Sequence, residues 1–407
     1  MKVIDGGITA AKGFEAAGVE AGIKYQGRKD MALIYSRKPC RAAGVFTSNV
    51  VKAAPVLWDK EVVAHSPYAQ AVVINAGIAN ACTGKQGYEC CSKTAQAAAE
   101  HLQIPADSVL VASTGVIGMQ LPQDKLNAGV KKLVEAKADT IEAGQIAAEA
   151  IMTTDTVFKQ AAVTFEIGGK TVTLGGMCKG SGMIHPNMCT MLCFLTSDIA
   201  ISKELMQEAL SENVVDTFNM VSIDGDTSTN DTLVVLANGM AENPEITSKN
   251  EDYDKFVEAL NYINTTLAKK MAGDGEGATA LFETKVINAA TKEDARRLSK
   301  SVICSSLTKA AIFGHDANCG RILCALGYSG VDFDPEKIEL RLENKDKSIL
   351  IYKDGVMTDY DEEEASQILA SEEVRALVDM KMGTAQACAW GCDLTYDYVK
   401  INADYRS

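Results

Sequence analysis

The segment KGSGMIHPNMCTML, residues 179–192, carries a threonine inside an apolar run that the chain reaches through a proline. A threonine in such a run is usually a half-buried strand residue. Its hydroxyl can also act as a nucleophile when the α-amino group of the same residue is free to serve as its base. That amine has a pKa of about 7.7–8.0, so a neutral fraction is present near physiological pH. Thr190 gains such an amine only if the chain is cut directly before it.

Composition and charge are those of an ordinary globular protein. The chain has 407 residues, of which 47% are hydrophobic, enough for a large core in two or three domains or subdomains. It carries 40 basic and 54 acidic residues, a formal net charge of -14, and no run of lysine or arginine. This balance argues against nucleic acid or an anionic membrane as partner and favours a small-molecule substrate.

The sequence also bears on the compartment and on metal binding. Its first residues lack the apolar stretch of a signal peptide, and no later stretch approaches the roughly 20 apolar residues of a spanning helix. We therefore expect a cytoplasmic protein that does not bind membranes, with reduced, packed cysteines. The pairs Cys189/Cys193 and Cys388/Cys392 are isolated and there are only four histidines, so we expect no metal site.

Helical and strand patterns alternate in the first half of the chain, which predicts an α/β or α+β layered fold. Residues 71–77 and 108–116 read as buried strands, with an alanine-rich helix over 88–102 between them. A further helix is expected over 139–152 with Asp139 as its N-cap. The glycines at 168 and 169 then predict a hairpin.

In the second half, the spacing of Phe256, Leu260, Ile263, Leu267 and Met271 predicts a helix that ends at the glycine cluster GDGEG. Beyond about residue 280 the pattern changes to alternating strands with a turn at residues 354–355, then an acidic helix and a final strand. We therefore predict a catalytic α/β domain over 1–280 and a smaller C-terminal domain over 281–407.

Four polar, glycine-rich stretches are candidates for the functional site: STGVIG (113–118), MTTDT (152–156), KGSGMIHPNMCTML (179–192) and GDGEGAT (273–279). Loops carry catalytic groups more often than core elements do. Each stretch by itself is equally typical of a turn between a strand and a helix. The four histidines form no recognisable Ser-His-Asp motif, which leaves threonine chemistry as the stronger candidate.

Taken together, the motifs resemble those of the ornithine acetyltransferase family, the glutamate N-acetyltransferases of arginine biosynthesis. The matching blocks follow in order along nearly the whole chain: GGITAAKGFEAAGVEAGIK, GRKDMALI, AGVFTSNVVKAAPV, NACTG, STGVIG, IMTTDT, KGSGMIHPNMCTML, SIDGDTSTNDT, GDGEGAT, KAAIFGHDANCGRIL and WGCDLTYDYVKINADYRS. A match of this many blocks in the same order is specific to the family, whereas a match of one glycine-rich motif would not be.

The resemblance implies a self-processing N-terminal-nucleophile enzyme with the fold shared by ornithine acetyltransferases and DmpA-like aminopeptidases. The precursor would cut its own Cys189–Thr190 bond, giving an α chain over 1–189 and a β chain over 190–407. Thr190 would take the acetyl group from N-acetylornithine, release ornithine and pass the acetyl group to glutamate. The resemblance further implies an α2β2 heterotetramer and no cofactor, and it leaves open whether acetyl-CoA is also a donor.

Family roles carry over to further residues of this chain. Thr114 and Gly115 match an oxyanion-hole pair, whose donors stabilise the developing negative charge. Substrate-binding positions match Lys179, Glu276, Asn402 and Ser407. Within MTTDT, the sequence does not decide between Thr153 and Thr156 as the substrate contact.

Several positions depart from the family pattern. Cys189 stands where alanine is usual, His185 replaces a usually small residue, and Ser407 replaces a threonine but keeps the hydroxyl. Two alternatives remain at this stage: an N-terminal-nucleophile aminopeptidase or amidase, in which water meets the acyl-enzyme, and a non-catalytic binding module with an uncut chain. Exclusion of water from the acyl-enzyme would separate the transferase from the hydrolase.

Overall fold

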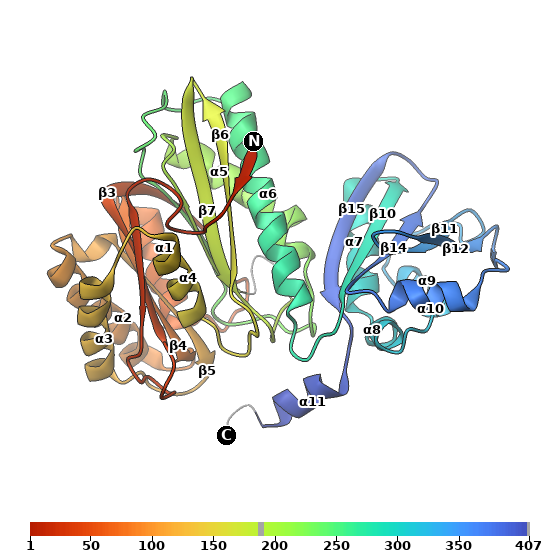
Figure 1. Cartoon of the computed structure of the whole chain (residues 1–407), viewed down its shortest axis with the longest axis horizontal. Helices are drawn as coiled ribbons and strands as arrows, with labels where there is room; N and C mark the ends of the chain where they lie inside the picture. Colours follow the sequence, from red (N-terminus) through yellow and green to blue (C-terminus); the bar gives the residue numbers. More distant parts are fainter. Residues whose placement is uncertain (186–190, 405–407) are drawn as a thin grey trace. The chain divides into compact units, whose positions relative to one another are not determined.

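The computed structural model describes residues 1–185 and 191–404 and divides the chain into two compact units (Figure 1). Unit 1 comprises Met1–Gly180, Pro186–Phe218 and Thr227–Leu267, and unit 2 comprises Ser181–His185, Asn219–Asp226 and Ala268–Ser407. The longest segment of unit 2 therefore begins at Ala268, whereas the sequence predicts a domain boundary at residue 281. Both units combine helices with a sheet, so the predicted mixed α/β class is confirmed.

Unit 1 is built on a sheet that has nine strands in the described part of the chain, in the order β1-β6-β7-β8-β9-β3-β4-β5, with β2 paired to β3. Its strands are β1 (Lys2–Ile4), β2 (Phe14–Val19), β3 (Met31–Phe46), β4 (Ala69–Ile78), β5 (Val109–Val116), β6 (Lys159–Ile167), β7 (Lys170–Lys179), β8 (Leu192–Ser197) and β9 (Thr232–Ala237). Its helices are α1 (Ala54–His65), α2 (Gly84–Leu102), α3 (Gln123–Ala136), α4 (Ile141–Ala150), α5 (Lys203–Asp216) and most of α6 (Glu251–Gly273).

Strand β4 is buried along its whole length because apolar side chains cover both of its faces. Val72 and Ile74 lie in one hydrophobic cluster, which also contains side chains of α1 and α4. Val73, on the opposite face, lies in a second cluster with side chains of α2 and α3. A strand covered on both faces reads as a continuous apolar run, which is why the sequence predicted it correctly.

The predicted strand-helix-strand unit and the hairpin are both confirmed. Strands β4 and β5 pair in parallel on either side of α2 in the sequence, and β6 and β7 pair antiparallel across the turn at residues 168–169. The N-cap prediction for α4 is wrong. Thr140 Oγ1 accepts the Ala143 N–H at 3.1 Å, whereas the Asp139 carboxylate accepts a hydrogen bond from Arg37 at 2.8 Å.

Unit 2 contains a six-stranded sheet, within the described residues, in the order β13-β12-β11-β14-β10-β15. Its strands are β10 (Leu281–Ala289), β11 (Glu339–Glu343), β12 (Ser348–Lys353), β13 (Val356–Met357), β14 (Glu373–Asp379) and β15 (Ala385–Cys392). Its helices are α7 (Lys292–Cys304), α8 (Ser306–Phe313), α9 (Cys319–Gly327), α10 (Glu362–Leu369) and α11 (Tyr396–Ala403).

The ends of these elements test the remaining predictions. Helix α6 stops at the glycine cluster, and β12 and β13 turn at residues 354–355, as expected. The predicted final strand is wrong, because the last element in the described residues is helix α11. The reason lies just after β15, where the Asp393 carboxylate accepts hydrogen bonds from the Thr279 hydroxyl and the N–H groups of Thr279 and Ala280. These bonds turn the chain out of the strand ladder. No helix in the described residues is both long and apolar enough to span a membrane.

Candidate active site

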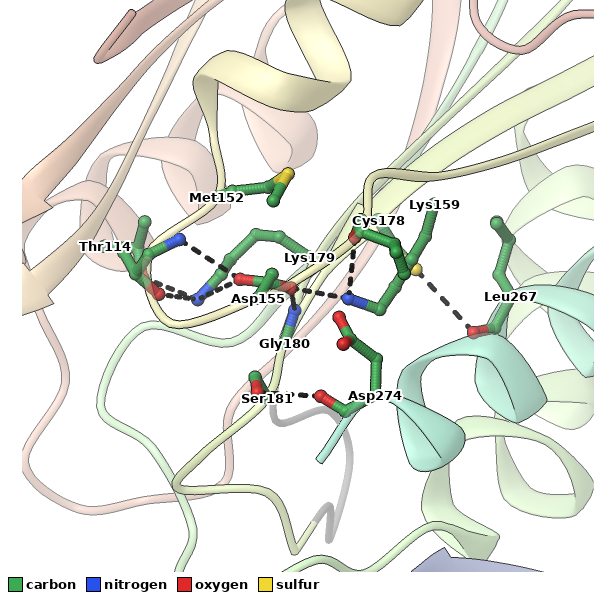
Figure 2. Close-up of polar contacts among 12 residues, drawn as sticks. Thr114, Met152, Asp155, Lys159, Cys178, Lys179, Gly180, Ser181, Leu267 and Asp274 are labelled. Atoms are coloured by element: carbon green, nitrogen blue, oxygen red, sulfur yellow. Dashed lines mark hydrogen bonds and ion pairs between the residues drawn. The ribbon is translucent and has the colours of Figure 1, made fainter. Parts of the chain in front are cut away.

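Lys179 is the centre of a polar cluster in unit 1 (Figure 2). It is the last residue of β7, its side chain is 9% exposed, and its backbone pairs with that of Leu192, the first residue of β8. Its Nζ donates to Thr153 Oγ1 at 2.7 Å and to Thr114 Oγ1 at 3.4 Å. The structure thus brings together three predicted site residues from separate stretches of the sequence.

Asp155 organises this cluster, although no role was predicted for it from its motif. Its side chain is fully buried, and its Oδ1 accepts from Lys159 Nζ at 2.7 Å and from the Gly180 N–H at 2.8 Å. Its Oδ2 accepts from the Thr153 N–H at 3.1 Å and lies 3.7 Å from Lys179 Nζ. One carboxylate therefore fixes the backbone on both sides of the cluster and faces two ammonium groups.

The two lysines keep this carboxylate ionised. Burial alone would raise the pKa of Asp155, but the charges of Lys179 and Lys159, with the hydrogen bonds from Lys159 and the Gly180 N–H, outweigh burial and hold its pKa below the usual range. Lys159 is itself buried, with a side chain only 1% exposed. Because buried charges are tolerated only when they are paired, Asp155 and Lys159 depend on each other.

The predicted oxyanion pair lies near the end of β5. Gly115 has a φ of +127° and pairs with Gly77 of the neighbouring strand β4, and a Cβ at Gly115 would lie 2.2 Å from the Gly77 carbonyl carbon. Only glycine fits there, both for its backbone conformation and for the close approach of the two strands. Thr114 directs its hydroxyl to Lys179, as described above.

Asn230 and Arg28 support these loops and were not singled out from the sequence. Asn230 Nδ2 donates to the carbonyl of Ser113 at 2.8 Å and to that of Ala79 at 2.6 Å, which ties the end of β5 to the loop after β4. Arg28 Nη2 donates to the Met152 carbonyl at 2.6 Å. No local sequence signal reveals these contacts, because each joins residues more than a hundred positions apart.

The structure separates the two threonines that the sequence could not. Thr153 accepts the hydrogen bond from Lys179, whereas Thr156 is an exposed residue of the loop before β6. The geometry therefore favours Thr153 as the residue that shares the Lys179 environment, while the substrate role stays a prediction.

Glu276 and Asn402 come together within unit 2. Glu276 is 6% exposed, its Oε2 accepts from Asn402 Nδ2 at 2.6 Å, and its backbone N–H donates to the Ser181 carbonyl at 3.0 Å. Gly182 packs against this carboxylate, since a Cβ at Gly182 would lie 2.4 Å from it. The Ser181 hydroxyl donates to the Asp274 carbonyl at 2.7 Å (Figure 2). The small residues of the KGSG stretch therefore allow its backbone to lie directly against Glu276.

Three predicted positions, Cys189, Thr190 and Ser407, lie outside the described residues. Met191, which follows Thr190 in the sequence, is 4% exposed, and its carbonyl accepts the Thr232 N–H at 2.8 Å. Strand β8 is thus tied to β9 directly after the predicted cleavage point.

The described groups favour acyl chemistry at the end of β5 and β7. An ammonium group and two hydroxyls converge there, and the adjoining glycine is held by backbone packing, which suits recognition of an anionic substrate group or oxyanion. A separate carboxylate-amide pair, Glu276 and Asn402, suits a cationic or amino group. Among residues 1–185 and 191–404, no group of three or more histidine, cysteine, aspartate or glutamate side chains is arranged to hold a metal ion.

Known proteins resemble this chain over its full length. Arginine biosynthesis bifunctional protein ArgJ from Caldanaerobacter subterraneus subsp. tengcongensis is 50% identical over 407 residues, covering 100% of both chains. The protein of the same name from Symbiobacterium thermophilum is 51% identical over 409 residues, again covering 100% of both.

Solved structures and a family model extend this comparison. The crystal structure of Arginine biosynthesis bifunctional protein argJ from Bacillus halodurans is 44% identical with a TM-score of 0.50, covering 52% of this chain and 97% of that one. Ornithine acetyltransferase from Mycobacterium tuberculosis, complexed with ornithine, is 45% identical with a TM-score of 0.42, covering 46% and 96%. A family model described as ArgJ family matches residues 15–407. The chain therefore belongs to the ArgJ family.

Proposed function

We propose that this chain is a glutamate N-acetyltransferase of arginine biosynthesis, which transfers the acetyl group of N2-acetylornithine to glutamate through an acetyl-Thr190 intermediate. The observation that carries the proposal is the Lys179 cluster. Lys179 pairs with Leu192, two residues after Thr190 in the sequence, and its ammonium group contacts both Thr114 and Thr153. Membership of the ArgJ family and the full-length match to ArgJ proteins support the same activity.

Activation begins with self-cleavage. The Thr190 hydroxyl attacks the Cys189 carbonyl carbon, the acyl group moves from nitrogen to oxygen, and water hydrolyses the ester. The products are a carboxylate on Cys189 and a free α-amine on Thr190, which then acts as the base of its own hydroxyl.

Transfer then follows in two half-reactions. The Thr190 hydroxyl attacks the acetyl carbonyl of N-acetylornithine, its proton passes through the α-amine to the departing amine, and ornithine leaves. The α-amine of glutamate attacks the acetyl ester and restores the hydroxyl. In this scheme Thr114 and Gly115 stabilise the oxyanion, Lys179 binds a substrate carboxylate, and Thr153, Glu276, Asn402 and Ser407 complete the substrate site. Because Thr190 itself carries the acetyl group, no cofactor is required.

The first test concerns cleavage. Intact-mass measurement of purified protein should give two fragments split between Cys189 and Thr190, and Thr190→Ala should stay whole and inactive. An active wild-type enzyme in one uncut chain would overturn the mechanism. Light scattering on the same sample should give about twice the mass of one 43.4 kDa chain if two α and two β chains assemble.

The second test concerns the acceptor. N-acetylornithine plus glutamate should yield acetylglutamate with little free acetate, whereas dominant acetate would identify a hydrolase of the aminopeptidase or amidase class. A parallel reaction with acetyl-CoA and glutamate decides whether this second donor is also used. Fractionation of cells should place the enzyme in the cytoplasm.

A further inference from the structure

The segment Ser181–His185, which leads toward the predicted cleavage bond, is held by a loop of the same unit. Asp224 Oδ2 accepts the Met183 N–H at 2.6 Å, and Asp224 Oδ1 accepts the Ile184 N–H at 2.9 Å. The Ile223 N–H donates to the Ile184 carbonyl at 2.7 Å, and His185 Nδ1 lies 2.9 Å from Ser222 Oγ. Loop residues 222–224 therefore hold three consecutive residues of the segment.

The backbone of Met183 is strained where Asp224 binds it. Met183 has a φ of +55°, a left-handed conformation that is unfavourable for residues other than glycine, and its side chain does not compensate by burial, since it is 42% exposed. Successive N–H groups around a left-handed residue form a concavity that binds anions. The carboxylate of Asp224 fills this concavity and stabilises the strained turn.

Asp224 is itself fixed from two further sides. The Asp226 N–H donates to its Oδ1 at 3.2 Å, and the Tyr398 hydroxyl donates to its Oδ2 at 3.3 Å. Burial and the Asp224 charge raise the pKa of Tyr398, so its hydroxyl remains a donor at physiological pH. These four partners of the carboxylate are all donors, and two of them belong to the segment Ser181–His185.

Resting on the self-cleavage proposed above, we infer that Asp224 is a positioning residue for this step: it holds Met183 and Ile184 in the left-handed turn from which the chain approaches the Cys189–Thr190 bond. Attack by a hydroxyl on the preceding carbonyl demands a narrow geometry, and anchoring the chain a few residues before the bond limits the conformations it can adopt. Once the bond is cut, residues 181–189 become the end of the α chain, and the anchor no longer has a bond to position for cleavage.

The test compares cleavage rates of newly made precursor. Wild type, Asp224→Asn, Asp224→Ala and the matched control Asp226→Asn are synthesised in a cell-free system, and whole and cut chains are quantified by mass over time. Because charge-assisted hydrogen bonds to backbone N–H groups are lost, Asp224→Asn should cut about tenfold more slowly and Asp224→Ala more slowly still. Asp226→Asn should be cut at the wild-type rate, since Asp226 contacts Asp224 through its backbone N–H, which the substitution keeps. The acetyl-transfer rate per cut chain, measured on the same samples, reports any effect on the neighbouring Glu276 and Asn402 separately from the cleavage rate.

The outcomes separate this inference from the proposed function. A wild-type chain that is not cut at Cys189–Thr190 overturns the proposed self-cleavage. A wild-type chain that is cut while Asp224→Asn is cut equally fast overturns the positioning role alone.

A second variant distinguishes positioning from general destabilisation. Met183→Gly, added to Asp224→Asn, removes the strain of the left-handed turn without replacing the carboxylate. Partial recovery of the cleavage rate supports positioning, and no recovery overturns it, whatever the melting temperature of the Asp224→Asn chain.

Discussion

Asp155 in unit 1 and Asp224 in unit 2 are carboxylates used in different ways. Asp155 is fully buried and faces the ammonium groups of Lys159 and Lys179 as well as two backbone N–H groups. Asp224 is partly exposed, and its partners are backbone N–H groups and the Tyr398 hydroxyl. Asp155 thus arranges charged side chains around the candidate site, whereas Asp224 shapes the backbone that leads toward the predicted cleavage point.

The largest expected effect follows from removing Asp155. Asp155→Ala removes the buried carboxylate that pairs with Lys159 Nζ at 2.7 Å, and breaking a buried ion pair from one side costs about 3–5 kcal/mol of folding stability. Urea unfolding in the uncut Thr190→Ala background measures this loss. The double variant Asp155→Ala with Lys159→Met should recover part of it. A loss of folding stability below about 1 kcal/mol for the single variant would contradict the mutual dependence of Asp155 and Lys159.

The next effect concerns the predicted oxyanion strand. Gly115→Ala places a methyl group against Gly77 and should lower acetyl transfer about a hundredfold or more, comparable to loss of an oxyanion donor. Gly118→Ala is the matched control, because Gly118 also has positive φ, +87°, but a Cβ there meets nothing within 4 Å. Similar kcat values for the two variants would show that the close approach to Gly77 is unimportant.

A smaller effect separates the two threonines of the MTTDT stretch. Thr153→Val removes the acceptor of the Lys179 hydrogen bond and should lower kcat/KM about tenfold, the equivalent of about 1.4 kcal/mol. Thr156→Val, in the exposed loop position, should stay within about twofold of wild type. The reverse order would assign the substrate contact to Thr156.

A further effect is a pH dependence of stability in unit 2. Burial, together with the charge of Lys300, lowers the pKa of His185 to about 4 from its ordinary 6.5, although Asp224 acts in the opposite direction. The folded state thus holds His185 neutral while the unfolded chain takes up a proton, so stability that is complete above pH 6.5 is lost as the pH falls toward 4. Urea midpoints measured between these limits should fall less steeply for His185→Gln than for wild type. Equal slopes would show that His185 is not held neutral.

Most of the elements of unit 1 could be predicted because their signals are local. The apolar run of β4 and the spacing along α6 are properties of consecutive residues. The N-cap at Thr140 was missed by one residue, since Asp139 is an equally good capping residue until its pairing with Arg37 is known. Helix α11 was missed because none of its side chains is buried, so its sequence has no amphipathic pattern.

The candidate site shows the same limit. Lys179, Thr114 and Glu276 were found through the motifs of a family, whereas Asp155 and Asp224 stood inside the quoted motifs without a role. What distinguishes Asp155 is its burial between two lysines, and what distinguishes Asp224 is a turn forty positions away in the sequence. Neither property is visible in the order of residues.

The strand order of unit 1 has a consequence for the two chains that cleavage would produce. Strands β8 and β9 belong to the β chain, yet they lie between β7 and β3 of the α chain, and both borders are continuous ladders, from Leu174–Ser197 to Lys179–Leu192 and from Arg41–Ala237 to Phe46–Thr232. The two fragments would therefore be interleaved, and neither could dissociate without breaking the backbone hydrogen bonds of both ladders. The proposed cut would change only the covalent connectivity of a sheet that has already formed, so the protein would have to fold as one chain before it could work as two.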